Sequence, residues 1–288
     1  MTQFLAVTLN GLTLSALYFI VASGFTLVFG LMRNINLAHG SLYLLGAYLG
    51  YEALALSGNW FVAVAVGFAA MALVGVVLQM LVFRHLEGQD LRQTLVSLAL
   101  SIILADLMLA YWGGQTYRIQ PPELLSGSMP LGIEALPYYS AIRLSMLAVA
   151  VVIAVALWVF LSRTRLGMMI RAGVDDRSML QASGVNVHRV FAATFGVGAG
   201  LAGLAGVVGG TVLSVSPGED IRILLASLVV VIVGGMGSVA GSAIGAVLIG
   251  LAEQYGLAYT PTYGALYMFI ILVVVLAVRP QGLMGRAQ

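Results

Sequence analysis

The feature that most constrains this chain is its division into long apolar runs, separated by short stretches of charged or turn-forming residues. Each run has roughly the 20 residues that a helix needs to span a bilayer. The runs cover residues 4–31, 37–57, 60–83, 93–112, 139–161, 190–215, 223–252 and 262–278. Of the 288 residues, 61% are hydrophobic and 8% are charged, against roughly 45–50% and about 25% in soluble domains. The sequence therefore predicts an all-α polytopic membrane protein with about eight hydrophobic segments, in which residues 1–288 form a single transmembrane domain.

The seventh run is interrupted by glycine. A β-branched stretch is followed by Gly234, Gly235, Gly237 and Ser238. Irregular backbone at membrane depth is tolerated only where protein or a water-filled cavity satisfies its polar groups. The break is either a pair of half-helix ends that line a solute path, as in many transporters, or a structural kink. We expect 223–252 to be broken or re-entrant.

Arginine positions predict the orientation, because cytoplasmic loops carry an excess of basic residues. Loop 162–189 holds five of the 13 basic residues and is expected in the cytoplasm. Counting spans backward from this loop places the N-terminus and the proline-rich stretch 113–138 outside. If 223–252 makes no net crossing, the C-terminus lies in the cytoplasm. Ten of the 13 basic residues are then cytoplasmic.

Small residues form a stripe on the sixth segment. Gly198, Ala202, Gly206 and Gly210 fall at every fourth position and share one helix face. Small faces let helix backbones approach closely in lipid, where apolar burial alone does not drive association. The stripe predicts close packing within the chain or, as the alternative, a subunit interface.

Several activities are excluded by residues that the chain lacks. It has no cysteine, and all 13 basic residues are arginine. Without lysine it cannot contain a P-loop of the form GxxxxGK[ST], so it cannot itself be a P-loop ATPase. The three histidines show no metal-ligand spacing, and the net charge of +2 is spread over loops. We therefore expect no metal or cofactor in this chain and no nucleic-acid surface. Because neither HExxH nor GxSxG occurs, we also expect no enzyme.

Loop 162–189 contains signals of a short helix. Asp175 or Asp176 can cap its N-terminus, and Gly184 stands where a left-handed residue ends a helix. A capped helix in a cytoplasmic loop is not needed for membrane insertion. It either docks onto a cytoplasmic partner or lies on the lipid surface.

Polar residues within the apolar runs are candidates for a translocation path, because such groups are costly in a bilayer and usually face protein or water. Asn36, His39 and Ser41 lie between two runs, so they either line the path or form a cytoplasmic helix end. Asp106 lies within the fourth run and could contact a substrate ammonium, pair with an arginine, or stay protonated. Glu253 is near a segment end and is expected in water.

Three stretches in this order resemble the permease subunits of branched-chain amino-acid ABC importers (the LivH type). They are GLTLSALYFIVASGFTLVFGLMRNINLAHGSLYLLGAY, RAGVDDRSMLQASGVNV and VGGMGSVAGSAIGAVLIG. The resemblance covers nearly the whole chain. It implies a multi-pass subunit of a bacterial plasma (inner) membrane importer that moves branched-chain or related amino acids into the cell.

The resemblance also implies partners and sites. The partners are two cytoplasmic ABC ATPase subunits that bind the ATP, a second related permease subunit, a periplasmic solute-binding protein and the lipid bilayer. The coupling loop within 162–189 would include Arg171, Ala172, Asp175, Asp176, Arg177, Ala182, Gly184 and Asn186. The family's N-x-A-H-G element corresponds to Asn36, Ala38, His39 and Gly40, and its glycine break to Gly234, Gly235, Gly237 and Ser238. The candidates for the translocation path are Asn36, His39, Gly40, Ser41, Asp106, Gly234, Gly235, Gly237 and Ser238.

The competing hypothesis is a stand-alone secondary transporter or channel for a small polar solute. Intramembrane ionisable residues are few, and no chain of carboxylates is present that could relay protons or bind a coupling ion. A secondary carrier also has no need of a site for an ATPase. These observations favour the importer subunit.

The absence of cysteine makes the orientation testable by labelling. We expect Ser178→Cys to react with a membrane-impermeant maleimide only from the cytoplasmic side, and Ser126→Cys only from outside, because they lie on loops of opposite assignment. The cysteine-free chain is the background control. The reverse pattern of labelling would overturn the orientation.

Overall fold

The computed structural model describes residues 2–32, 34–133 and 136–285. Helices dominate it, and short 3₁₀ turns cover Phe83–Leu86, Glu123–Leu125 and Pro261–Tyr263. The helices and strands are α1 (Thr2–Met32), α2 (His39–Ser57), α3 (Trp60–Leu81), α4 (Asp90–Trp112), β1 (Ser128–Ile133), β2 (Leu136–Ser140), α5 (Ala141–Arg163), α6 (Arg165–Asp175), α7 (Arg177–Ala182), α8 (Val187–Val212), α9 (Glu219–Gly234), α10 (Val239–Tyr259) and α11 (Leu266–Val278).

Every predicted apolar run contains helix, but fewer helices than eight qualify as membrane spans. Five helices (α1, α3, α4, α5 and α8) are long and apolar enough to cross a bilayer. The pair α9 and α10 would make a sixth span, but its two helices are bent by 118° at the glycine break. The seventh run is therefore broken, as predicted, whereas a count of about eight spans is not confirmed. The 13-residue α11 is a shorter apolar helix.

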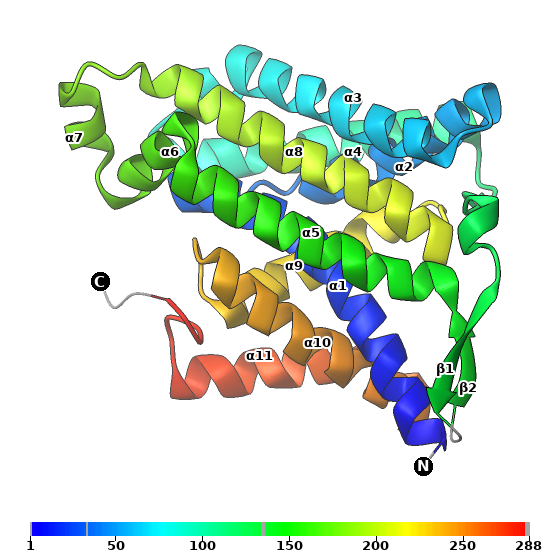
Figure 1. The fold of residues 1–288 in the computed structure, drawn as a ribbon. Helices are drawn as coiled ribbons and strands as arrows, with labels where there is room; N and C mark the ends of the chain where they lie inside the picture. The colour runs from blue at the N-terminus through cyan, green and yellow to red at the C-terminus, as the bar shows by residue number, and fades with distance from the viewer. Residues whose placement is uncertain (1, 33, 134–135, 286–288) are drawn as a thin grey trace.

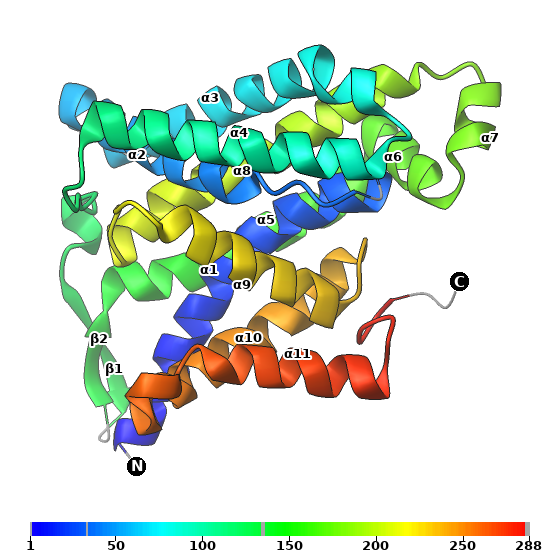
Figure 2. The same cartoon turned by 180° about the vertical axis from the view of Figure 1, so that it is seen from behind.

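Two helices form the centre of the molecule. In α1 and α8, 94% and 83% of the apolar window is buried within the chain, against 11% in α4. Helix α8 packs most extensively on α3 and α2, and α1 packs on α10 and α8. Figures 1 and 2 show α3, α4 and α5 on the outside of this pair. The exposed apolar faces of these outer helices suit contact with lipid or with another membrane subunit.

The small-residue stripe of α8 packs against other helices of the same chain. A methyl group added at Gly206 would lie 2.1 Å from the carbonyl oxygen of Tyr43 on α2. One added at Gly198 would lie 2.7 Å from the carbonyl oxygen of Gly24 on α1. Residues of the stripe are thus used within the fold, which supports the first of the two predicted uses.

A two-stranded hairpin at one end of the molecule departs from the all-α prediction. Strands β1 and β2 pair antiparallel, with Met129 opposite Tyr139. The Tyr139 hydroxyl donates to the Asn10 side chain of α1 at 2.9 Å, which fixes the hairpin to the N-terminal end of that helix. Figure 1 shows the hairpin and α7 at opposite ends of the molecule. This separation agrees with the predicted placement of 113–138 and 162–189 on opposite sides of the membrane.

The close approach of α8 to α2 gives a stability prediction. We expect Gly206→Ala to lower the melting temperature in detergent, because its methyl group would overlap the Tyr43 carbonyl and separate the helices. Overpacking of this kind typically costs about 1–3 kcal/mol. Gly114→Ala is the control, since no atom lies within 4 Å of its added methyl group. Equal melting temperatures for the two variants would contradict the packing described here.

Candidate functional site

The loop 162–189 folds into a projection made of two helices and a capped connection to α8. Thr164 caps α6 by accepting from Gly167 N, and Asp176 caps α7 by accepting from Met179 N at 3.0 Å. Asp176 is thus the predicted N-cap, whereas Asp175 is the last residue of α6. Hydrogen bonds from the Ser178 hydroxyl and then the Met179 amide hold the pKa of the Asp176 carboxyl below its ordinary value. The carboxylate therefore stays ionised at neutral pH.

The far end of α7 follows the predicted pattern. Gly184 has φ +80°, in the left-handed region that favours glycine, and lies two residues after α7 ends. Asn186 then caps α8 by accepting from Arg189 N. The prediction missed α6, because two helices that meet at a single residue look like one loop in the sequence.

The projection is fixed to the two central helices by a small apolar cluster. Leu180 is the buried residue of α7 and packs with Leu31 at the end of α1 and Phe191 at the start of α8. Gly173 of α6 allows this contact, since an added methyl group would lie 2.8 Å from Leu31 and 3.1 Å from Leu180. The apolar cluster therefore joins α7 to the ends of α1 and α8.

The residues assigned to the coupling loop lie mostly on the open surface of this projection. The exposed ones are Arg171, Ala172, Asp175, Asp176, Ala182, Gly184 and Asn186. Arg177 belongs to α7, and its side chain lies outside the described part of the structure. Met179 is 70% exposed, which leaves a large apolar side chain on the same surface. Such a residue at a projecting tip is suited to contact with another protein.

A second candidate region lies inside the molecule, where an extended segment runs beside α4. Thr94 of α4 donates to Asn34, and Ser97 accepts from Leu37 N at 3.0 Å. Ser41 and Ser101 share a hydrogen bond of 2.8 Å. In each pair the partners are 60 residues apart, so the segment 34–38 and the start of α2 run parallel to α4. Arg33 lies outside the described residues.

Asn36 and His39 are buried rather than placed at an exposed helix end. Asn36 accepts from Ala38 N at 3.1 Å and so forms the turn into α2. Its amide nitrogen is buried and has no hydrogen-bond partner among the described residues. His39 Nε2 lies 3.1 Å from the Val21 carbonyl of α1, and because a carbonyl only accepts, this nitrogen donates. Both residues thus lie at the start of α2, and whether they line a translocation path or form a cytoplasmic helix end stays open.

The N-terminus of α9 meets that of α2 at this point. A methyl group at Gly40 would lie 2.1 Å from the Asp220 carbonyl oxygen, so only glycine allows the two first turns to approach. The buried Asp220 carboxylate accepts a long hydrogen bond of 3.4 Å from Ser41. Two helix N-termini, a carboxylate and two serines thus gather inside the apolar core. The sequence singled out residues within 36–41, whereas Asn34, Ser101 and Asp220 were missed.

The glycine break is a tight turn whose backbone is satisfied by the chain's own tail. Gly235 and Gly237 have φ of +107° and +83°, and Ser238 caps α10 by accepting from Gly241 N. Leu283 N donates to Val233 O, and Met284 N donates to Gly234 O, both at 2.9 Å. These bonds use the free carbonyl groups at the end of α9. The geometry accounts for the break as a structural turn, and a role in the translocation path stays a prediction.

Asp106 lies on the exposed face of α4. Its neighbours on that face include Ile102, Ile103 and Leu107, which are exposed by more than half. It forms no hydrogen bond or ion pair with another described residue. An unpaired carboxylate on an apolar surface is costly in lipid, so this face is better suited to a partner subunit or an aqueous path than to acyl chains.

The expectation that Glu253 is solvated is wrong. Glu253 is 7% exposed and accepts from the Tyr18 hydroxyl of α1 at 2.5 Å. Arg222 of α9 lies 3.7 Å from its other oxygen and 2.8 Å from Glu219. No sequence motif brings these residues together, because Tyr18 comes from α1, more than 200 residues before Arg222 of α9 and Glu253 of α10.

Comparison with known proteins agrees with a helical membrane transport subunit. The sequence profile of the family described as "Branched-chain amino acid transport system / permease component" matches residues 7–278. The permease protein BraD of Pseudomonas aeruginosa is 31% identical over 300 residues, which cover 99% of this chain and 97% of the relative. LivH of Escherichia coli K12 is 30% identical over 302 residues, which cover 99% and 96%. Both relatives are described as high-affinity branched-chain amino acid transport system permease proteins. No solved structure matches the chain.

The class defined by these features is a polytopic membrane permease component. The chain belongs to the family of branched-chain amino acid transport system permeases.

The network around Glu253 predicts a stability effect. We expect Glu253→Ala to destabilise the fold by about 1–3 kcal/mol, because it leaves the buried Tyr18 hydroxyl without an acceptor and removes one of the two carboxylates near Arg222. The measurement is the midpoint of thermal unfolding in detergent. Glu123→Ala, at an exposed glutamate of the loop between α4 and β1, is the control. A midpoint for Glu253→Ala equal to that of the control would show that the network contributes nothing.

Proposed function

We propose that this protein is the transmembrane permease subunit of an ABC importer that carries branched-chain or related amino acids across a bacterial inner membrane. Separate ATPase subunits drive it, a second related permease completes the membrane part, and a periplasmic binding protein delivers the solute. The observation that carries the proposal is the exposed, capped projection α6–α7, which packs directly on the two central helices. Family membership and the relatives' names support the solute class.

The projection has the properties of an ATPase coupling element. Its outer surface offers the Met179 side chain and the ionised Asp176, and its inner surface is anchored by Leu180. An ATPase subunit that binds the outer surface and moves would displace the ends of α1 and α8 through Leu180. Because both helices form the core, such a displacement would alter the region where the first turns of α2 and α9 meet, around His39 and Asp220. We call this region the buried junction.

The translocation path would then run beside this junction, between two permease subunits. The Asn36 amide nitrogen, which has no hydrogen-bond partner among the described residues, provides a donor inside the core. The Asp220 carboxylate, which accepts only a long hydrogen bond from Ser41, provides an acceptor. Asp106 adds an unpaired carboxylate on the face of α4 that a second permease could cover. The proposed orientation places α7 and the C-terminus in the cytoplasm and the hairpin outside.

A stand-alone carrier remains less well supported. It would need a coupling-ion or proton site, for which the sequence shows no chain of carboxylates along the membrane segments. It would also leave the capped projection without a purpose. The capped projection and the family assignment both favour the importer subunit.

Coupling is tested by changes that leave the membrane helices intact. We expect Asp176→Arg to insert normally but to uncouple amino-acid uptake from ATP hydrolysis, because it removes the cap of α7 and reverses a charge on the docking surface. Gly184→Pro is expected to do the same, since proline cannot adopt the observed φ of +80°. The measurement is ATP hydrolysis and leucine uptake by the complete system in vesicles, with uptake expected to fall at least about tenfold.

Gly88→Pro is the matched control for backbone strain. Gly88 is another positive-φ glycine, at +77°, on the same side of the molecule but outside the projection, with no atom within 4 Å of an added methyl group. Normal uptake in both Asp176→Arg and Gly184→Pro would refute the docking role. An equal loss of leucine uptake in Gly88→Pro would show that the effect comes from a folding defect and not from loss of docking.

A further inference from the structure

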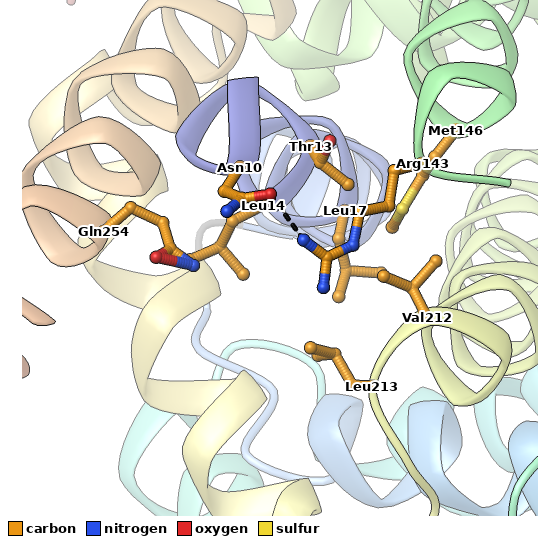
Figure 3. Close-up of a pocket in the computed structure, with 9 residues that line it drawn as sticks. All are labelled: Asn10, Thr13, Leu14, Leu17, Arg143, Met146, Val212, Leu213 and Gln254. Carbon is orange, nitrogen blue, oxygen red and sulfur yellow. Dashed lines mark hydrogen bonds between the residues drawn. The ribbon is translucent and has the colours of Figure 1, made fainter. Parts of the chain in front are cut away.

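A small pocket lies at the hairpin end of the molecule, away from the projection and the buried junction. Figure 3 shows that α1, α5, α10 and the end of α8 each contribute to its wall. Its cavity volume is about 40 Å³. A cavity needs roughly 10–15 Å³ to hold one water molecule, so this one has room for about two or three waters or for a single monatomic ion. It is too small for an amino acid or a lipid headgroup.

Arg143 supplies the positive charge at this pocket, and it is the only charged residue among the described ones that line it. One guanidinium nitrogen donates to the Asn10 side-chain oxygen, which also accepts from the Tyr139 hydroxyl. Figure 3 shows the other terminal nitrogen directed away from Asn10 and toward Leu213. Within the described part of the chain the guanidinium forms no ion pair. Because a guanidinium has five N–H donors, most of them remain available to another ligand.

Two side-chain amides provide further donors at the same pocket. Figure 3 shows the Gln254 amide with its nitrogen toward the pocket and its oxygen away from it. The side-chain nitrogens of Gln254 and Asn10 form no hydrogen bond with any other described residue. The remaining polar group is the Thr13 hydroxyl, which donates to the Leu9 carbonyl at 3.0 Å. The pocket thus combines unused N–H donors from α1, α5 and α10.

No carboxylate among the described lining residues offsets the charge of Arg143. Glu253 precedes Gln254 in the chain, but it accepts from the Tyr18 hydroxyl and lies near Arg222 instead. The rest of the wall is apolar and is formed by Leu14, Leu17, Met146, Val212 and Leu213. A partly enclosed charge in such surroundings is unfavourable without a partner of opposite charge.

We propose that this pocket binds one chloride-sized anion, held by the Arg143 guanidinium and the amide nitrogens of Gln254 and Asn10. Hydrogen bonds from an ionised donor to an anion are roughly twice as strong as neutral ones, and the amides add further donors. The cavity volume selects for size, since an organic anion does not fit. The bound ion would link α5 to α1 and α10, and so stabilise the end of the molecule that carries the hairpin. The site goes beyond the proposed function, because it needs no transported solute.

The test is thermal unfolding of the purified full chain in a neutral detergent, at constant pH and ionic strength, with sodium gluconate replaced stepwise by sodium chloride or sodium bromide. We expect the unfolding midpoint to rise saturably by at least about 3 °C with either halide, because a ligand that binds only the folded state stabilises it. Arg143→Gln should lose this rise, whereas Arg143→Lys should keep part of it. Gln254→Leu should shift saturation to about tenfold higher chloride, because it removes a hydrogen bond to the ion.

Arg118→Gln is the matched control for loss of a positive charge. Arg118 is an exposed arginine in the loop between α4 and β1, and it does not line the pocket. This variant should show the same chloride-dependent rise as the unaltered protein. A second measurement needs no variant: the unaltered protein should broaden the NMR signal of chloride in solution, and added bromide should narrow it again by competing for the site.

Three results would overturn the proposal. The first is the same unfolding midpoint in chloride and in gluconate, which would mean that water alone fills the cavity. The second is an equal chloride-dependent rise in Arg143→Gln and the unaltered protein, which would be a general effect of salt. The third, which holds even if Arg143→Gln fails to fold, is a chloride NMR signal that the unaltered protein does not broaden or that bromide does not narrow.

Discussion

The fold depends on backbone contacts between helices that carry almost no side chain where they meet. In lipid, apolar burial gives little net drive for helix association, so packing must come from close van der Waals contact. Gly206 against Tyr43, and Gly198 against Gly24, bring α8 to within contact of α2 and α1. With α8 held in this way, α3 packs along it, while the broken pair α9–α10 packs on α1 and, through α9, on α2. Larger residues on this stripe would separate the helices and open the core.

That close packing determines where polar groups can be placed. The buried Ser41 and Asp220, and the half-buried Ser101, lie where glycine at position 40 allows two helix N-termini to meet. Glu253 is stabilised by Tyr18 and Arg222 in a similarly enclosed setting. A buried charge without such partners would be strongly unfavourable. The polar sites of the molecule are therefore products of its helix packing.

The sequence predicted the features that depend on local chemistry. The apolar runs contain the helices, Asp176 is a cap and Gly184 is left-handed, because capping and positive φ involve only a few neighbouring residues. Features that depend on contacts between distant segments were missed. Glu253 looked like a solvated segment end until Tyr18 and Arg222 were brought beside it.

Helix α1 links the two ends of the molecule. Its 31 residues make a rod of about 46 Å at 1.5 Å per residue. Leu31 at one end touches the projection, Val21 accepts the His39 hydrogen bond, and Asn10 near the other end bonds to Arg143. If such a rod pivots without bending, a push on its Leu31 end swings the opposite end the other way. A displacement of Leu31 would then reach the Arg143 guanidinium as a shift of its Asn10 partner, with no chain of side-chain rearrangements in between.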